Sequence, residues 1–348
     1  MVRWPFRDFI RRHDWLIKII TLFSVGSLLL VFMLLNIRVE RLQAMMQYVS
    51  PVWLLYSSLS LLISFFFKAL RWRLLLRPFK NSARVSNLFW IIGVGFLVNT
   101  LLPIRVGDVA RAYVVGEKEG LDFAPSLSSI VVEKVLDMIG LLGMGLVAVF
   151  FMPLGSGSQG WIMQGLKVVG VVVAALLFVT ALAVVREESM LTFLDRLSIS
   201  IPLLARVRVL KFIKNFIGGL KPLYVNVKLL FINMALTVAD WFTFCLGIFF
   251  IFAAFNFVIP IGAFVLGGVL VGLSYLLPAP PGYAGTYEVY WTLIFMAMGF
   301  TESDLLLAIG LFSHVVSVLV TAVVGYLGII WLGLSFGKVL GVVRRGKS

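Results

Sequence analysis

Long apolar runs constrain the fold of this chain more than any other feature. Several of them approach the roughly 20 residues that a helix needs to cross the hydrocarbon core of a bilayer. The chain is 61% hydrophobic and 13% charged, whereas an average soluble domain carries roughly 25% charged residues. The alternating pattern of transmembrane β-strands is absent. The sequence therefore predicts an all-α fold, that of a polytopic helical membrane protein.

We expect six uninterrupted membrane spans. They lie near residues 15–35, 52–70, 126–152, 162–185, 229–257 and 304–334. Two further apolar regions are interrupted at a Leu-Leu-Pro sequence, because proline removes a backbone donor and disfavours helix in the residue before it. The expected helical pieces are 87–102 followed by about 107–116, and 261–277 followed by about 284–298.

The formal charge of +14, from 30 basic and 16 acidic residues, does not indicate a nucleic-acid partner. The basic residues fall in short segments beside the expected spans, where the positive-inside rule and anionic lipid head groups explain them. Cys245 is the only cysteine, which excludes an intrachain disulfide and cysteine-based metal sites. We expect neither a metal nor a cofactor.

The distribution of charge predicts the topology. Four basic segments should be cytoplasmic, which places both termini inside: 1–18, 68–84, 186–228 and 338–348. The uncharged segment 152–161 and the acidic segment 299–304 should lie outside. Parity of crossings then makes 87–116 a re-entrant hairpin from the cytoplasmic side and 261–298 one from the opposite side.

A weak internal repeat agrees with this topology. The segment that starts at Asn99, NTLLPIRVGDVARAY, aligns without gaps to SYLLPAPPGYAGTYE from Ser274. Inverted repeats whose broken helices face a midplane site are a recurring transporter architecture. We therefore expect one transmembrane domain over 1–348. It would divide into repeat 1 at about 52–185, an amphipathic cytoplasmic linker at about 186–228, and repeat 2 at about 229–334. The run 15–35 is longer than a signal-peptide core and is expected to be retained.

The first interruption carries charges inside an apolar region. Ionisable side chains at membrane depth are costly, and they usually mark a site or a pathway. Arg105 and Arg111 are candidate phosphate ligands, because a guanidinium presents a planar fork to anionic oxygens. Asn99 and Asp108 flank the break and are candidate binding residues with them. The alternative is that Arg105–Asp108 and Arg111–Glu133 are structural ion pairs.

The next expected helix carries a polar stripe. Ser126, Ser129, Glu133 and Asp137 recur at spacings of three and four, and Lys134 lies beside them. The two carboxylates are candidates to carry protons, or else they neutralise neighbouring cations. We include Glu133, Lys134 and Asp137 among the candidate substrate-binding residues.

The second interruption, LPAPPGYAGTYE, cannot form a continuous helix. Glu288 is the lone carboxylate of the helix that follows, and Tyr283 is a candidate to line an amphipathic groove. Interfacial anchoring by the tyrosines is the alternative. His314, in the final span, lies near the position that the repeat pairs with Glu133 and Lys134, so it is a candidate binding residue or a packing histidine.

The polar residues around both interruptions resemble one membrane family. Asn99-Thr-Leu-Leu-Pro103-Ile-Arg105-Val-Gly107-Asp108, then Val132-Glu133-Lys134 and the later Pro281-Gly282, resemble the flippase-like family of the lysylphosphatidylglycerol synthase transmembrane region. The resemblance covers essentially the whole hydrophobic chain. It implies an inner-membrane protein that moves a lipid or lipid-linked precursor between leaflets. Because the 348 residues include no soluble aminoacyl-transferase domain, we expect no lipid aminoacylation.

The leading hypothesis is a lipid translocator, or flippase, for an anionic phospholipid or a polyprenyl- or hopanoid-type lipid. It would act in the cell inner (cytoplasmic) membrane, alone, as a homo-oligomer or with a membrane synthase. The sequence contains no phosphate loop, dinucleotide fingerprint or nucleophile elbow, so we expect no enzymatic activity. Two alternatives remain: an intramembrane lipid-modifying enzyme that uses Glu133 or Asp137 as acid or base, and a non-catalytic scaffold of a lipid or glycan synthase complex.

Overall fold

The computed structural model describes residues 46–102, 106–152, 226–277 and 279–335, with isolated positions between 164 and 218. The ordered elements in these ranges are α-helices and one short 3-10 helix, with no β-strand, which confirms the all-α class. The expected span 15–35 lies outside the described residues, and the span 162–185 and the linker 186–228 lie largely outside them. The division of the chain into two repeats therefore stays a prediction.

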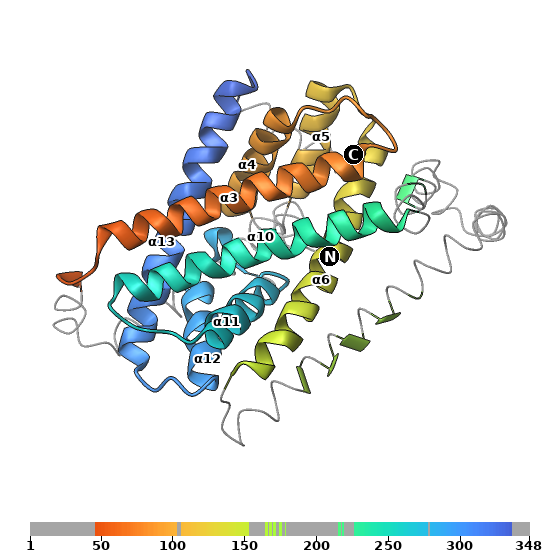
Figure 1. Ribbon diagram of the computed structural model, residues 1–348. Coiled ribbons are helices and arrows are strands. Elements are labelled where there is room, and N and C mark those ends of the chain that lie inside the picture. The colour runs from red at the N-terminus through yellow and green to blue at the C-terminus, as the bar shows by residue number, and fades with distance from the viewer. Residues whose placement is uncertain are drawn as a thin grey trace, which may run out of the picture.

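Four long helices form the frame of the described part (Figure 1). They are α3 (Pro51–Leu76), α6 (Phe123–Phe150), α10 (Val227–Ala254) and α13 (Ser303–Trp331). α3, α10 and α13 are long and apolar enough to cross a membrane. Even the shortest of the four, with 26 residues, reaches about 39 Å at 1.5 Å per residue, more than a hydrocarbon core of about 30 Å. The chain is a multi-pass helical membrane protein.

Both expected helix interruptions are present. In the first, α4 (Val85–Leu101) is followed by α5 (Gly107–Glu119). In the second, α11 (Ile261–Ser274), the 3-10 helix η1 (Pro281–Tyr283) and α12 (Thr286–Ala297) follow one another. Pro103 and Pro278, to which we attribute the breaks, lie outside the described residues.

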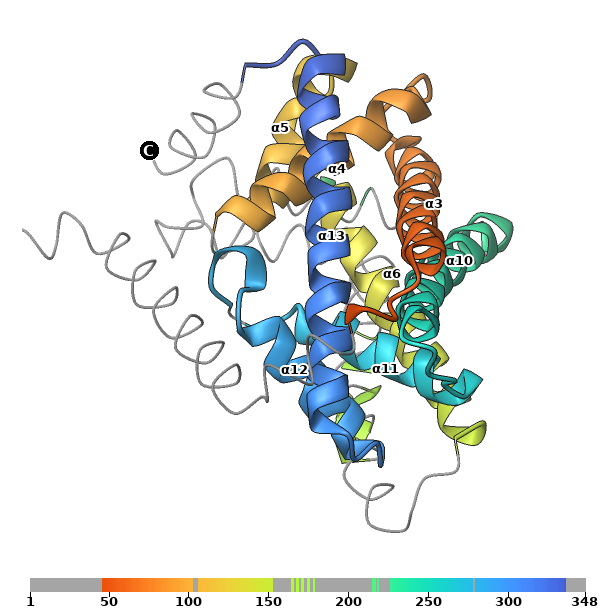
Figure 2. The same ribbon diagram turned by 90° about the vertical axis from the view of Figure 1, so that its left-hand side faces the viewer.

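The two broken helix pairs lie toward opposite ends of the molecule, and α13 runs past both of them (Figure 2). Their broken ends meet between the pairs. A Cβ atom added at Gly282 of η1 would lie 3.7 Å from the carbonyl oxygen of Thr100 in α4. This arrangement agrees with two opposed hairpins, and their entry from opposite faces of a bilayer stays a prediction.

Each broken pair has its own apolar core. One core surrounds α4 and α5 and includes Trp72 and Leu88, and the other surrounds α11 and α12 and includes Phe252 and Trp291. The long helices contribute to both cores, so their middle turns cross from one to the other. The polar side chains of α3, α6 and α13 lie at these middle turns, between the two apolar cores.

One expected boundary is wrong. We predict a span that ends near residue 70, with Lys68 and Arg71 counted in a cytoplasmic segment, but α3 continues to Leu76. The helix continues because Trp72 and Leu75, beyond the expected end, are buried in the first core. Lys68 and Arg71 therefore belong to the interior of the helical bundle.

Candidate functional site

Arg71 is the centre of a buried cluster of charges between the two cores. Its side chain is fully buried, and Nη1 donates hydrogen bonds to Asp137 Oδ1 at 2.7 Å and to Thr237 Oγ1 at 2.8 Å. Its other terminal nitrogen lies 3.8 Å from Glu133 and 3.9 Å from Asp240. One guanidinium thus faces carboxylates from α6 and α10, which its planar fork of donors suits.

Arg111 of α5 is enclosed by protein groups. Its two terminal nitrogens contact the two carboxylate oxygens of Glu133 at 3.1 and 2.8 Å, the bidentate geometry that is strongest for this pair. The guanidinium lies 4.3 Å from the ring centre of Trp72, and Asp108 lies 3.6 Å away. Both Arg111 and Glu133 are 1% exposed. This pair joins α5 to α6, as the structural alternative expects.

Lys68 of α3 forms the other end of the cluster. Its Nζ lies 2.6 Å from Asp240 Oδ2, and Ser64 Oγ donates to the second oxygen of the same carboxylate at 2.5 Å. The lysine also lies 4.9 Å from the ring centre of Trp241. Trp241 in turn donates its ring N–H to Asp137 at 3.0 Å. Lys134 and Asp108 complete the cluster at 3.8 Å from each other.

This charge cluster balances in formal charge. Its basic members are Lys68, Arg71, Arg111 and Lys134, and its acidic members are Asp108, Glu133, Asp137 and Asp240. Removing an ion from water costs several kcal/mol even after relaxation, so an unpaired charge at this depth would be strongly unfavourable. Pairing explains how α3, α6 and α10 carry charged residues inside an apolar bundle.

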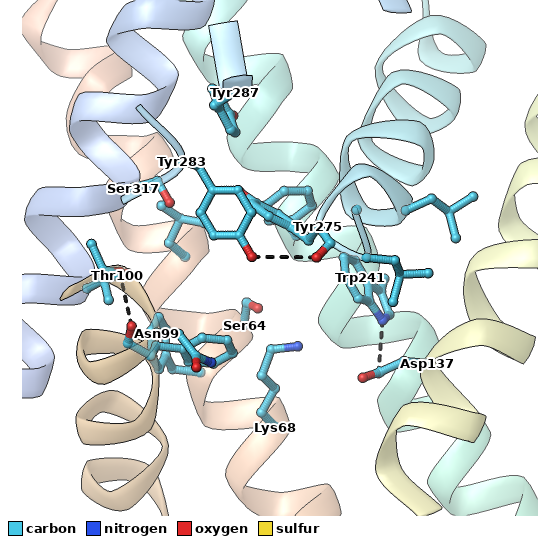
Figure 3. A pocket seen from close by; sticks show the side chains of 18 of the residues that line it. Ser64, Lys68, Asn99, Thr100, Asp137, Trp241, Tyr275, Tyr283, Tyr287 and Ser317 are labelled. Carbon is cyan, nitrogen blue, oxygen red and sulfur yellow. Dashed lines mark hydrogen bonds between the residues drawn. The ribbon is translucent and has the colours of Figure 1, made fainter. Parts of the chain in front are cut away.

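A cavity of about 370 Å³ lies between the charge cluster and the two helix breaks. Figure 3 shows Lys68 pointing into it, with Asn99 and Thr100 of the first break on one side and Tyr275 and Tyr283 of the second break above. Apolar residues complete the walls: Leu61, Phe65, Phe96, Met138, Leu141, Phe244, Leu273, Leu276 and Val318. The cavity is therefore amphipathic, with charged groups on one wall and apolar side chains around them.

Some charged side chains of the cluster reach the cavity, and others lie behind its wall. Lys68, Asp108, Lys134 and Asp137 line it, but neither Arg111 nor Glu133 does. The side chain of Lys134 is 33% exposed and that of Lys68 is 12% exposed. Each lysine therefore has an acidic partner on one side and access to the cavity on the other.

The two breaks are fixed by polar contacts. Asn99 Oδ1 accepts a hydrogen bond from the backbone N–H of Gly107 at 2.7 Å, which satisfies a donor at the start of α5. Gly282 has φ +67°, a left-handed conformation that glycine adopts without steric cost. Tyr283 donates from its hydroxyl to the carbonyl of Tyr275 at 3.5 Å and helps to close the top of the cavity in Figure 3.

His314 connects the second break to α13. One ring nitrogen lies 2.6 Å from Glu288 Oε1 and the other 2.6 Å from the carbonyl oxygen of Gly282. Glu288 is buried, and His314 lines the cavity. In the part of the chain that the structure describes, no three His, Cys, Asp or Glu side chains converge as ligands for a metal ion.

The structure brings most of the sequence-predicted residues to this region. Those that line the cavity are Asn99, Asp108, Lys134, Asp137, Tyr283 and His314. Arg111 and Glu133 lie behind its charged wall, and Glu288 lies behind His314. Arg105 lies outside the described residues.

Lys68, Arg71 and Asp240 supply much of the charge at the site, and the sequence reasoning did not predict how they pair. The sequence did contain a signal for the longer α3. Trp72 and Leu74–Leu76 extend the apolar pattern beyond residue 70, which places Lys68 and Arg71 inside the helix and not after it. Asp240 stands alone in its apolar span, so its sequence context gives no partner.

Comparison with known proteins identifies relatives of the chain. The sequence profile described as the lysylphosphatidylglycerol synthase TM region matches residues 15–325. A UPF0104 membrane protein of Methanocaldococcus jannaschii is 22% identical over 191 residues, which are 55% of this chain and 75% of that protein. A UPF0104 membrane protein of Methanothermobacter thermautotrophicus is 25% identical over 244 residues, 67% of this chain and 69% of that protein.

A third relative is longer than the part it shares. The glycosyltransferase AglD of Haloferax volcanii is 25% identical over 309 residues, which are 78% of this chain but only 48% of that protein. No solved structure matches the chain. Because the profile covers residues 15–325, nearly all of the helical bundle, the chain belongs to the lysylphosphatidylglycerol synthase TM region family of membrane proteins.

Proposed function

We propose that this protein is a lipid translocator that moves an anionic phospholipid or a lipid-linked precursor between the leaflets of the cell inner membrane. The observation that carries the proposal is the amphipathic cavity where the two broken helix pairs meet. A lipid has a charged head group and apolar acyl chains. The cavity offers charged side chains for the head group and apolar side chains for the acyl chains. Irregular backbone at membrane depth is tolerated where it lines such a cavity.

Lys68 and Lys134 are the head-group ligands in this proposal. Both reach the cavity, and each is neutralised from one side by a carboxylate, Asp240 or Asp108. A lysine ammonium has three donors, so donors remain for a lipid phosphate. Arg111 is committed to Glu133 and supports the wall. The acyl chains would stay against apolar residues and the bilayer.

The test is leaflet exchange of fluorescent phosphatidylglycerol in liposomes that contain the purified protein. A membrane-impermeant quencher should reach only outer-leaflet label without protein and nearly all label with it. Lys134→Gln should slow exchange roughly tenfold or more, because a hydrogen bond to a charged group contributes about 1.5–3 kcal/mol. Lys118→Gln is the matched control, since Lys118 pairs with Glu117 and does not line the cavity.

Mass spectrometry of the same liposomes separates the alternatives. Exchange of an unmodified lipid supports the translocator. A new lipid species would support a lipid-modifying enzyme instead. The absence of both exchange and a new lipid species would favour a scaffold for a membrane synthase. Exchange that Lys134→Gln leaves unchanged would contradict the assigned head-group site.

A further inference from the structure

The second helix break is held by one histidine ring. His314 of α13 has Nδ1 at 2.6 Å from Glu288 Oε1 of α12 and Nε2 at 2.6 Å from the carbonyl oxygen of Gly282 in η1. The ring also stacks on Tyr287, with ring centres 4.7 Å apart. The ring therefore ties α12, α13 and the wall of the cavity together.

The two contacts of this ring determine how many protons it needs. A carbonyl oxygen only accepts hydrogen bonds, so Nε2 must carry a hydrogen toward Gly282. In a neutral ring Nδ1 is then an acceptor, and Glu288 must supply the hydrogen between Oε1 and Nδ1. In a charged ring Nδ1 carries that hydrogen itself. In either form the Glu288–His314 pair holds one proton more than a carboxylate beside a neutral imidazole.

The carboxyl group of Glu288 is enclosed by protein. Its side chain is 2% exposed, and the second oxygen, Oε2, is buried without a hydrogen-bond partner among the described residues. The ion-pair partner that the described part of the chain gives Glu288 is His314. An ionised carboxylate with an unpaired buried oxygen costs several kcal/mol. A hydrogen between Oε1 and Nδ1 of His314 reduces this cost.

We propose that Glu288 and His314 form a proton-binding site that latches the second helix break to α13. When the shared proton leaves, the ring has one hydrogen for two acceptors. In the tautomer that carries this hydrogen on Nδ1, toward Glu288, the Gly282 carbonyl has no donor and the second helix break is released from α13. Gly282 and Tyr283 line the cavity, so the proton controls the mobility of its wall. The link to lipid movement rests on the proposed function, whereas the latch itself does not.

The other titratable groups around His314 are engaged with their own partners. Tyr287 of α12 shares a hydrogen bond with Ser313 at 2.9 Å, and Tyr283 of η1 bonds the carbonyl of Tyr275. The charged residues that face the same cavity come from three helices: Lys68 of α3, Asp108 of α5, and Lys134 and Asp137 of α6. These four residues pair within the charge cluster. The Glu288–His314 pair differs, because both ring contacts can be hydrogen bonds only while the extra proton is present.

Nitrogen NMR of the full chain in bilayers tests the latch without any transport assay. The chain has two histidines, so His13→Gln leaves His314 as the single reporter. At neutral pH we expect a protonated Nε2 and a strongly hydrogen-bonded Nδ1. At alkaline pH we expect a shift to the ring with hydrogen on Nδ1. An Nε2 without a bound hydrogen at neutral pH would overturn the proposal. A spectrum that does not change at alkaline pH would overturn it as well.

Glu288→Gln gives the matched variant. Its amide N–H donates to Nδ1 without a dissociable proton, so the latch should stay closed at every pH. The NMR signature should lose its pH dependence, and lipid exchange should lose the rise at alkaline pH that we expect of the unsubstituted protein. Glu302→Gln, an exposed change ahead of α13, should leave both profiles unchanged.

The outcomes distinguish the latch from the transport proposal. The expected NMR signature without lipid exchange supports the latch and contradicts the translocator. Exchange with an unaltered pH profile in Glu288→Gln contradicts control by the latch and leaves the translocator standing.

Discussion

At the scale of single residues, Arg71 is important for stability because it contacts several carboxylates and has no access to solvent. Its side chain is fully buried and faces carboxylates of two other helices, Asp137 and Glu133 on α6 and Asp240 on α10. Glu133 and Asp240 each have a second cation, Arg111 and Lys68. Asp137 therefore depends most on Arg71.

Replacing Arg71 should be strongly destabilising. Arg71→Met leaves the buried charge of Asp137 without its closest cation, and breaking a buried pair in this way costs about 3–5 kcal/mol. We expect a clear fall in the midpoint of thermal unfolding in detergent. Arg77→Met, at an exposed position one residue after α3, is the control and should change the midpoint little.

A double substitution tests the cause. Arg71→Met combined with Asp137→Asn removes the stranded charge and should recover part of the lost stability. A double variant as unstable as the sum of the two single variants would show that the damage comes from packing and not from an unpaired carboxylate.

At the scale of helices, the apolar pattern predicted most of what the structure shows. The expected pieces 107–116 and 284–298 correspond to α5 and α12, and the helices before them end at Leu101 and Ser274, within or shortly before the Leu-Leu-Pro sequences, because apolar run length and proline act locally. The pairing of charges could not be predicted in the same way. Arg71 meets Asp137 and Asp240 across separations of 66 and 169 residues, and periodicity within one helix contains no information about such partners.

The close packing of α4 against α5 also depends on their sequences. A Cβ atom at Gly107 would clash with the backbone carbonyl of Gly95 and with the side chain of Asn99. Glycine at this position therefore lets the two halves of the first break approach backbone to backbone. A larger residue must separate them and disturb the hydrogen bond that the backbone N–H of Gly107 donates to Asn99 Oδ1.

Gly107→Ala should loosen the first break. Forcing a methyl group into a packed contact costs about 1–3 kcal/mol, and the strain falls on the wall that Asn99 and Thr100 give the cavity. We expect a lower unfolding midpoint and slower lipid exchange. Gly143→Ala in α6 is the control, because a Cβ there meets nothing within 4 Å and alanine favours helix over glycine. Equal effects of the two substitutions would contradict the packing argument.

At the scale of the whole molecule, two apolar cores flank one polar layer. Each core surrounds one broken helix pair, and the cavity and the charge cluster occupy the middle turns of the long helices between them. α3 and α10 pack against each other extensively and lie side by side in Figure 1, with Ser50 bonded to Ala254 where α3 begins and α10 ends. In the proposed translocator, movement of a lipid past the cavity requires the broken pairs to move against this frame.

Cross-linking the two broken ends should stop that movement. With Cys245 replaced by Ala, Thr100→Cys and Gly282→Cys would place two thiols on the facing broken ends, because a Cβ atom at Gly282 would lie 4.0 Å from Cγ2 of Thr100. Oxidation should abolish lipid exchange, and reduction should restore it. A cross-link between Ser57→Cys of α3 and Gly247→Cys of α10, where a Cβ would lie 3.6 Å from Ser57 Oγ, joins two helices of the frame and should leave exchange intact. Undiminished exchange across a fully formed Thr100–Gly282 cross-link would show that lipids do not pass between the broken ends.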